Sequence, residues 1–225
     1  MSRTTKTLIP VLFLILVVSA PVFSETYPLD STEINRLDSF VMRPYNKTLS
    51  TVSTVTTAAS LAMPAVLLSA PSSEYLKIGI MYAETVALTY GIKELIKLIV
   101  PRQRPYLYYE GYPEDEVQSG KSHKSFLSGH TALAFAGASF TSYVFCKYNP
   151  ESKWKIPVVA SSYSLATATA VLRVASGNHF ATDVLAGALL GAAIGYGIPA
   201  IHTLFTEKDT ENPAPPFGLA FKVGL

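Results

Sequence analysis

The sequence predicts an all-α, membrane-embedded bundle of five to six helices, with a functional site at the outer ends of the helices. Two observations carry this prediction. Charged residues make up only 15% of the 225 residues, against about 25% in an average soluble domain, and they are unevenly distributed along the chain. Apolar and aromatic residues make up 49%, and the mean hydropathy is +0.29. These values exclude a disordered chain and a coiled coil.

Four stretches contain no Asp, Glu, Lys or Arg, and a fifth is apolar apart from two glutamates and two lysines. In chain order these are Thr48–Ser73, Ile78–Val100 (the stretch with the four charges), Phe126–Cys146, Ile156–Leu172 and Val184–Thr206. A helix of about 17–25 residues crosses the hydrocarbon core of a bilayer, so each stretch predicts one spanning helix. The overlapping Gly-x-x-x-Gly repeats from Gly187 through Gly191 to Gly195 predict close packing of the last helix against a neighbour.

The alternative is a soluble all-helical protein with buried helices, because Thr48–Ala59 and Ser161–Thr169 are rich in Ser and Thr rather than Leu. The net charge of +2 is too small to indicate a nucleic-acid partner. Cys146 is the only cysteine, which excludes an intramolecular disulfide and a metal site built from cysteines.

Residues 1–24 resemble an export signal. Arg3 and Lys6 precede the apolar run Leu8–Val18, and a small-residue pattern ends at Ser24. The segment is either a cleaved signal peptide or an uncleaved signal anchor. Both interpretations place the residues that follow it outside the cytoplasm.

We expect residues 25–206 to form one helical domain and residues 207–225 to form a tail that is not helical, because the tail contains three prolines. Alternating spans place Pro101–Lys124 and Arg173–Asp183 on the outer side. They place Lys147–Lys155, with three lysines and one glutamate, on the inner side. This agrees with the excess of Lys and Arg in cytoplasmic loops.

Ionisable residues at the ends of apolar spans are costly, so they mark functional sites. Lys97 and Arg104 are seven residues apart, close to two helical turns, and both can face one way where the helix runs out at Pro101. Taken alone, this pair is more simply explained as cations that anchor a helix end at the membrane surface.

A second polar group, Ser128-Gly129-His130, directly precedes the uncharged run Thr131–Cys146. Ser is a favoured N-cap, Gly lets the backbone approach a ligand, and the free N–H groups of the helix start would face an anion. A plain helix cap beside an unrelated histidine explains the same residues equally well.

A third polar group begins with Arg173 and continues through the turn Ser176-Gly177-Asn178, which we expect to start the last helix near His179. His179 and Asp183 would then occupy positions i and i+4 on one helical face. There the carboxylate can orient the imidazole and leave its other nitrogen free. A purely structural His–Asp pair is the alternative.

Together, the three groups bring three cations, two histidines, one carboxylate and helix N-termini to one face. This set favours an oxyanion, and its positive charge suits a phosphate monoester dianion. A histidine oriented by an aspartate can act as a nucleophile, and a second histidine can protonate the leaving oxygen. The residues contain no carboxylate cluster for a hard cation, so we expect no metal and no cofactor. They favour metal-independent phosphoryl transfer through a phosphohistidine.

The three groups resemble the signature motifs of the type 2 phosphatidic acid phosphatase superfamily, which are Lys-x6-Arg-Pro, Pro-Ser-Gly-His and Ser-Arg-x5-His-x3-Asp. The segment Lys97-x6-Arg104-Pro105 matches the first motif fully. Leu127 stands where the second motif has proline, and Leu172 stands where the third has serine. The resemblance covers about residues 78–206, which we take as the core of the domain.

The resemblance implies a role for each matching residue. His179 would be the nucleophile, Asp183 its orienting carboxylate and His130 the general acid for the leaving group. The phosphate oxygens would be held by Lys97, Arg104, Ser128, Gly129 and Arg173.

The resemblance also implies a phosphatase for lipid-linked phosphomonoesters or pyrophosphates, embedded in a bacterial inner membrane with its site facing the periplasm. The main alternative is a soluble periplasmic acid phosphatase of the same superfamily. A vanadate-dependent haloperoxidase would share the pocket, but those enzymes are usually much longer. A transporter is disfavoured because its site would lie near the bilayer midplane, and an inactive phosphatase that serves as a binding module would retain the same motifs.

Overall fold

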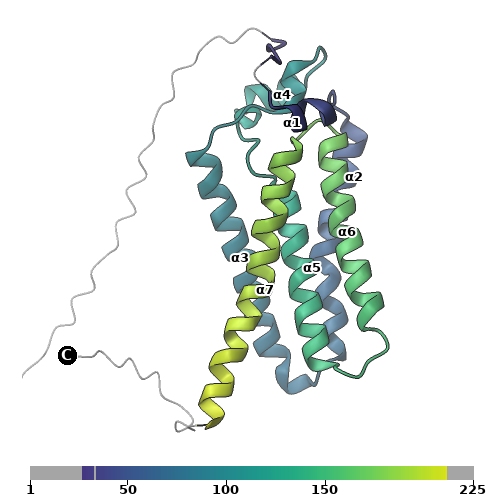
Figure 1. Ribbon diagram of the computed structural model, residues 1–225, viewed down its shortest axis with the longest axis vertical. Helices are drawn as coiled ribbons and strands as arrows, with labels where there is room; N and C mark the ends of the chain where they lie inside the picture. Colours follow the sequence, from purple (N-terminus) through teal and green to yellow (C-terminus); the bar gives the residue numbers. More distant parts are fainter. Residues whose placement is uncertain (1–26, 33, 212–225) are drawn as a thin grey trace, which may run out of the picture.

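The computed structural model describes residues 27–32 and 34–211, and within this part it is all-helical without a β-strand. Each of the five apolar stretches contains one long helix (Figure 1). The long helices are α2 (Lys47–Ala62), α3 (Tyr75–Ile99), α5 (Gly129–Tyr148), α6 (Lys155–Ala175) and α7 (Ala181–Glu211). The predicted all-α bundle is confirmed, whereas the expected export signal in residues 1–24 lies outside the described residues.

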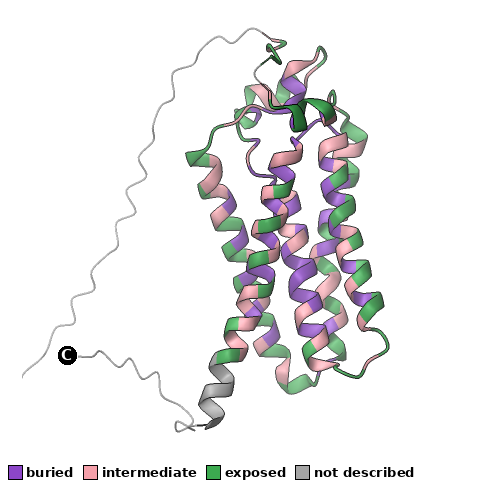
Figure 2. Cartoon of the chain, viewed as in Figure 1, coloured by how far each residue is buried: buried purple, intermediate pink, exposed green. Residues whose placement is uncertain are grey.

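Helix α5 forms the centre of the bundle, and α2, α3, α6 and α7 all pack against it. Successive long helices run in opposite directions (Figure 1). One end of the bundle, here called the site end, therefore holds the starts of α2, α5 and α7 together with the ends of α3 and α6. Most residues of α5 are buried, and most of these have small or hydroxylated side chains. The surrounding helices expose their outward faces (Figure 2).

Helix α7 lies unusually close to α5 because glycines occupy the contact. A Cβ atom on Gly187 would lie 2.6 Å from the carbonyl oxygen of Ser128, and Gly191 and Gly195 are still closer to carbonyl oxygens of α5. No side chain fits at such distances, so the glycine stripe confirms the predicted close packing. The contact also holds the start of α7 directly beside the start of α5.

Three segments of the described chain are long and apolar enough to cross a membrane. They are Lys47–Ser69, Lys155–Ala175 and Ala181–Leu204. The first combines α2 with the short helix η1 (Met63–Ser69). Large apolar side chains point outward from the bundle, among them Leu76, Ile156 and Leu189, which are 77%, 81% and 73% exposed.

Short helices cover the site end. They are α1 (Arg36–Val41), η3 (Pro105–Tyr108), α4 (Glu114–Gln118) and η4 (Lys121–His123), while η2 (Ser72–Glu74) lies at the opposite end before α3 (Figure 1). The segment after Pro105 is more than a polar loop, because Tyr106 and Leu107 are fully buried. The backbone N–H of Tyr106 donates to the carbonyl oxygen of Gly177 at 3.1 Å, which ties the segment to the connection between α6 and α7.

Both ends of α7 differ from the prediction. The helix begins at Ala181 rather than near His179, because Gly177 adopts a positive φ of 69° and turns the chain before the helix starts. The helix also continues to Glu211, so the start of the expected non-helical tail is helical. Residues 212–225 of that tail lie outside the described part of the chain.

Candidate active site

The structure brings all three predicted polar groups to the site end. Lys97 lies in the last turn of α3, His130 in the first turn of α5 and Arg173 in the last turn of α6. His179 lies in the connection between α6 and α7, and Asp183 lies in the first turn of α7. Residues more than 80 positions apart in the chain therefore come together at one end of the bundle.

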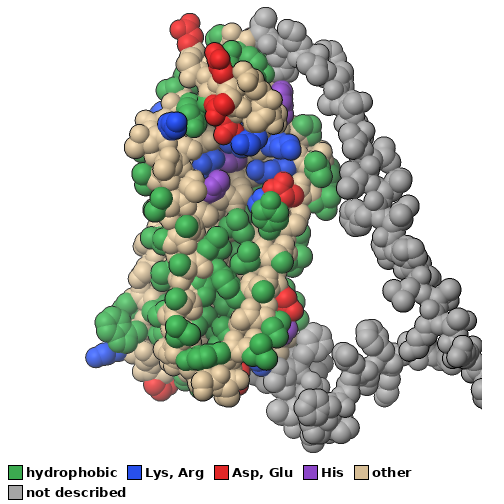
Figure 3. All heavy atoms as spheres, turned by 180° about the vertical axis from the view of Figure 1, so that it is seen from behind, with side chains coloured by type: hydrophobic (Ala, Val, Ile, Leu, Met, Phe, Trp, Pro, Cys, Tyr) green, Lys and Arg blue, Asp and Glu red, His purple; other side chains and the backbone are tan. Residues whose placement is uncertain are grey.

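A cavity of about 370 Å³ opens between α2, α3 and α5 at this end. Its polar wall includes Lys97, Arg104, Gly129 and His130, and its apolar wall includes Leu133. Seen from behind, Lys and Arg side chains gather with a histidine in a hollow near the site end, above a band of hydrophobic side chains (Figure 3). The cavity therefore has positively charged residues in one wall and apolar residues in another.

Two buried arginines are held in place by neutral partners. Arg104 donates from Nε to the carbonyl oxygen of Lys121 at 3.1 Å and from Nη1 to Oδ1 of Asn178 at 3.0 Å. Arg173 donates from Nη1 to Oγ of Ser53 at 3.1 Å, while its buried Nε has no hydrogen-bond partner. Because these partners carry no charge, both guanidinium groups keep their positive charge available for an anion.

The group at the start of α5 differs from the prediction in one detail. Ser128 occupies the N-cap position, but its Oγ lies 2.9 Å from Oγ1 of Thr131 and makes no capping bond to the backbone. Its backbone N–H donates instead to the carbonyl oxygen of Asp183 at 3.0 Å. A Cβ atom on Gly129 would lie 2.7 Å from Cδ of Lys93, so a larger residue there would displace that lysine side chain.

His179 and Asp183 lie together, but not on one helical face as predicted, since His179 precedes the helix. Both are buried, and His179 Nδ1 lies 3.5 Å from Asp183 Oδ2 without forming a hydrogen bond. The same carboxylate oxygen accepts the backbone N–H of Phe180 at 3.0 Å and the hydroxyl of Ser125. Catalytic hydrogen bonds in unliganded sites are often long and shorten when substrate binds.

Electrostatics at the site favour a neutral His179. Burial, followed by the charges of Arg173, Arg104 and Lys97, holds the pKa of His179 well below its usual value of about 6.5. An unprotonated imidazole is the nucleophilic form. Among the described residues, no group of three His, Cys, Asp or Glu side chains is arranged to hold a metal ion.

The model of the PAP2 superfamily matches residues 78–207, which is more than half of the chain. The chain belongs to the PAP2 superfamily. This membership confirms the resemblance seen in the three motifs, and the matched region contains every residue that the motifs singled out.

Named phosphatases are similar to this chain over part of its length. It is 33% identical to lipid phosphate phosphatase 1 of Arabidopsis thaliana, over 52% of this chain and 41% of that protein. It is 36% identical to lipid A 1-phosphatase of Porphyromonas gingivalis, over 34% of this chain and 16% of that protein. The chain thus matches less than half the length of these relatives.

A solved structure is also similar to this chain, at lower identity. The transmembrane PAP2 type phosphatidylglycerolphosphate phosphatase of Bacillus subtilis is 23% identical, and the superposition has a TM-score of 0.47. It covers 75% of this chain and 83% of that one.

Several residues that support the candidate site were missed by the sequence analysis. They are Asp38, Ser53, Arg102, Ser125 and Asn178, each of which bonds a motif residue or its neighbour. Arg102 could have been found, because it is a third cation in the segment that contains Lys97 and Arg104. Asp38 and Ser53 lie before the PAP2 match, and no pattern in the sequence links them to it.

Proposed function

We propose that this chain is a metal-independent phosphatase that hydrolyses lipid-linked phosphomonoesters or pyrophosphates through a phosphohistidine at His179. One observation carries the proposal. Three cations, a half-buried histidine and a buried histidine beside a carboxylate converge at one end of the bundle, next to a cavity with an apolar wall. The named relatives, which are phosphatases of lipids, support the same substrate class.

In the first step, the free ring nitrogen of His179 attacks phosphorus, and the bond between phosphorus and the lipid oxygen breaks. His130, which becomes protonated when the phosphate dianion offsets the surrounding cations, donates a proton to the departing oxygen, so that a neutral alcohol leaves. Asp183 faces the other ring nitrogen and stabilises the positive charge that develops on the imidazole.

In the second step, water attacks the phosphorus of the phosphohistidine. His130, now neutral, takes the proton of that water, and the bond between phosphorus and His179 breaks to release inorganic phosphate. His179 returns to the neutral form that burial and the surrounding cations favour. The enzyme is regenerated without any co-reactant other than water.

Charge stabilisation falls to Lys97, Arg104 and Arg173, helped by the backbone N–H of Gly129 and the hydroxyl of Ser128. Preorganised cations and N–H groups stabilise the charge on a transferring phosphoryl group. Both arginines are already fixed by neutral partners, so little reorganisation is needed when the phosphate binds. These groups supply the positive charge that a metal ion provides in other phosphatases.

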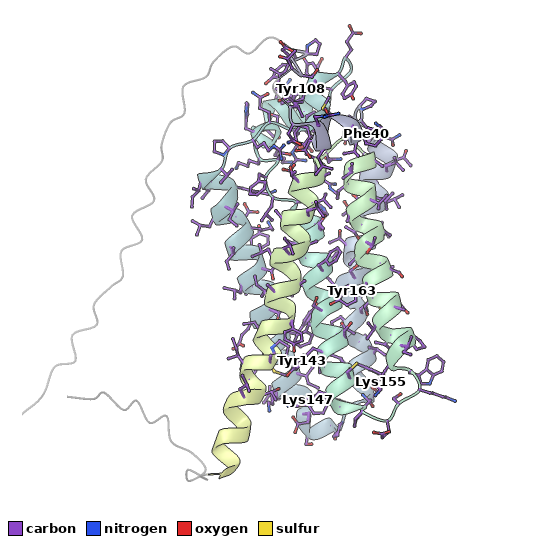
Figure 4. The ribbon with its side chains drawn as sticks, in the orientation of Figure 1. Phe40, Tyr108, Tyr143, Lys147, Lys155 and Tyr163 are labelled. Atoms are coloured by element: carbon purple, nitrogen blue, oxygen red, sulfur yellow. The ribbon has the colours of Figure 1, made fainter. Side chains whose placement is uncertain are left out.

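The exposed apolar side chains support a location in the membrane, because soluble proteins rarely expose such extended apolar surface. The loop with three lysines supports an orientation with the site end outward. Lys147 and Lys155 lie at the end of the bundle opposite Phe40 and Tyr108 (Figure 4). We therefore propose a bacterial inner-membrane enzyme whose site faces the periplasm.

A soluble periplasmic acid phosphatase is the second candidate, favoured by the Ser- and Thr-rich faces of α2 and α6. Washing membranes with alkaline carbonate separates the two, because an embedded protein stays with the membrane. Recovery of the whole protein in the wash would replace the first candidate by the second.

The proposed function is tested by phosphate release from phosphatidic acid, phosphatidylglycerol phosphate, farnesyl phosphate and farnesyl diphosphate, each measured with and without EDTA. We expect at least one lipid phosphate to be hydrolysed at the same rate with and without the chelator. A rate that vanishes in EDTA and returns with magnesium would contradict the metal-independent mechanism. Failure to hydrolyse any of the four would contradict the function itself.

A further inference from the structure

A buried network connects α1 to Asp183 of the site. Asp38 is fully buried in α1, and its Oδ2 accepts a hydrogen bond from Nη2 of Arg102 at 2.7 Å. Nη1 of the same guanidinium donates to Oδ1 of Asp183. Arg102 therefore bridges two carboxylates, one at each side of its fork. Neither Asp38 nor Arg102 is a member of the three motifs.

The same aspartate also holds the start of α7. Asp38 Oδ1 accepts the backbone N–H of Thr182 at 3.0 Å, and Oδ2 accepts the Thr182 hydroxyl at 2.7 Å. Thr182 Oγ1 in turn lies 2.7 Å from Nη1 of Arg102. Because Thr182 directly precedes Asp183, the network fixes both the backbone and the carboxylate of that residue.

Asp38 is held in place by its own surroundings. Asn35 donates from Nδ2 to Asp38 Oδ2 at 2.6 Å and accepts the Asp38 N–H at 3.0 Å. Burial alone would raise the pKa of Asp38, but the hydrogen bonds from Thr182, Arg102 and Asn35 lower it below its ordinary value. The carboxylate is therefore ionised at neutral pH and carries a full negative charge.

The negative charge of Asp38 affects Asp183, whose carboxylate lies beside both Arg102 and His179. Its Oδ1 receives the charged donor of Arg102, and its Oδ2 faces Nδ1 of His179 at 3.5 Å. A cation that paired with Asp183 alone would draw the carboxylate toward itself and weaken it as an acceptor for the imidazole. Asp38 offsets part of the positive charge of Arg102 and holds the guanidinium from the other side.

We propose that Asp38, acting through Arg102, is a positioning residue that sets the carboxylate of Asp183 against His179. The inference rests on the proposed function and adds a residue outside the PAP2 match to the support of the nucleophile. It assigns α1, which touches none of the cavity walls, a part in the chemical step rather than in substrate binding.

The test compares Asp38→Asn, Arg102→Gln and the double variant on the lipid phosphate that the wild-type protein hydrolyses best. Asparagine keeps the shape of Asp38 but loses its charge. We expect the kcat of monodisperse protein to fall about tenfold to a hundredfold. This is the usual loss when a residue that hydrogen-bonds a functional side chain, rather than the reacting atoms, is replaced. KM should stay within about twofold, because the groups that hold the phosphate are untouched.

The double variant separates positioning from simple stabilisation. If Asp38 acts through Arg102, the double variant loses no more than the worse single variant, because interacting residues are not additive. The proposal would be overturned if the loss of kcat in the double variant equalled the product of the two single losses. An unchanged kcat in Asp38→Asn, or a KM that rises while kcat stays constant, would also overturn it. Asp30→Asn, an exposed aspartate in the same segment, is the matched control and should leave kcat unchanged.

Thr182→Val tests the proposal if Asp38→Asn does not fold. It keeps the N–H bond to Asp38 and removes only the hydroxyl shared by Asp38 and Arg102. We expect kcat to fall about tenfold, the lower end of the range for one hydrogen bond to a charged group, while the unfolding temperature stays close to that of the wild type. An unchanged kcat would overturn the proposal. If the wild type and Asp30→Asn are also inactive, the proposed function has failed instead.

Discussion

The two histidines of the site lie in opposite kinds of surroundings. His179 is only 1% exposed, sits in the α6–α7 connection and has its backbone N–H bound to the carbonyl oxygen of Arg173 at 3.2 Å. His130 is half-buried, lines the cavity, and its Nε2 lies 3.5 Å from the hydroxyl of Thr54. The imidazole of His179 is enclosed by the protein, whereas that of His130 faces the cavity.

The difference suits two different tasks. A nucleophile must meet phosphorus in one geometry, and a rigid shell of buried partners provides that geometry at little entropic cost during reaction. A general acid must reach the leaving oxygen and afterwards activate water, so it needs access to the cavity. The enclosed histidine should therefore be needed for every substrate, and the accessible one mainly for substrates with poor leaving groups.

His179→Ala should have the largest effect. We expect kcat to fall by about 10⁴-fold or more on every phosphate ester, since loss of the nucleophile removes the covalent route. Acid-labile phosphoryl-enzyme, trapped from radiolabelled substrate by rapid mixing, should disappear as well. The matched control is His123→Ala, an exposed histidine at the same end of the bundle, which should keep wild-type kcat. A variant at position 179 with a substantial fraction of wild-type rate would mean that another group attacks phosphorus.

His130→Ala should have a smaller effect that depends on the substrate. A lipid alcohol is a poor leaving group, whereas p-nitrophenolate departs with little help. We therefore expect losses of about 10²–10⁴-fold on a lipid phosphate, the range of general acid–base catalysis, and clearly smaller losses on p-nitrophenyl phosphate. Both variants should be measured on both substrates near pH 6.

Equal losses on the two substrates would remove the distinction between the histidines on which this prediction rests. His130 would then be a phosphate-binding residue, and its place in the cavity wall beside Lys97 and Arg104 would be explained by charge alone. His179→Ala provides the reference, because its loss should be equally severe with either leaving group.

Much of the bundle could be predicted because helix formation and the faces of a helix depend on residues that are close together in the sequence. A charge-free stretch has to be a helix wherever water is excluded, since only internal hydrogen bonds then satisfy its backbone. The Gly187, Gly191 and Gly195 stripe predicted a close helix contact because spacing by four places residues on one face. The motif residues could be identified because their types, spacing and order resemble the three signature motifs of one superfamily.

The support behind the site could not be predicted, because it joins residues that are far apart in the chain. Arg102 and Asp38 are 64 positions apart, and Thr182 and Asp38 are 144 apart. Neither spacing reflects a helical repeat or a turn. The start of α7 was misplaced for a related reason, since it is set by an aspartate of α1 that bonds the Thr182 N–H as well as by the turn at Gly177.

The smallest predicted effect concerns the dependence of stability on pH. Burial and the nearby cations Arg173, Arg104 and Lys97 depress the pKa of His179 in the folded protein, while in the unfolded chain it returns to about 6.5. Below pH 6.5 the unfolded chain therefore takes up a proton that the folded protein does not, and this uptake favours unfolding. The stability contributed by the neutral imidazole is fully present above pH 6.5 and is lost as the pH falls.

This contribution amounts to about 1 kcal/mol between pH 6.5 and pH 5.5 for one such group. It should lower the unfolding temperature by about 2–4 °C in a chain of this size. His179→Gln removes this titrating group. Between pH 6.5 and pH 5.5 the unfolding temperature of the variant should therefore fall by about 2–4 °C less than that of the wild type. His123→Ala, which removes an exposed imidazole, should retain the full wild-type decrease. An equal decrease in the unfolding temperature of His179→Gln and of the wild type would mean that His179 is protonated as readily in the folded protein as in the unfolded chain. The two histidines of the site would then differ less than their surroundings suggest.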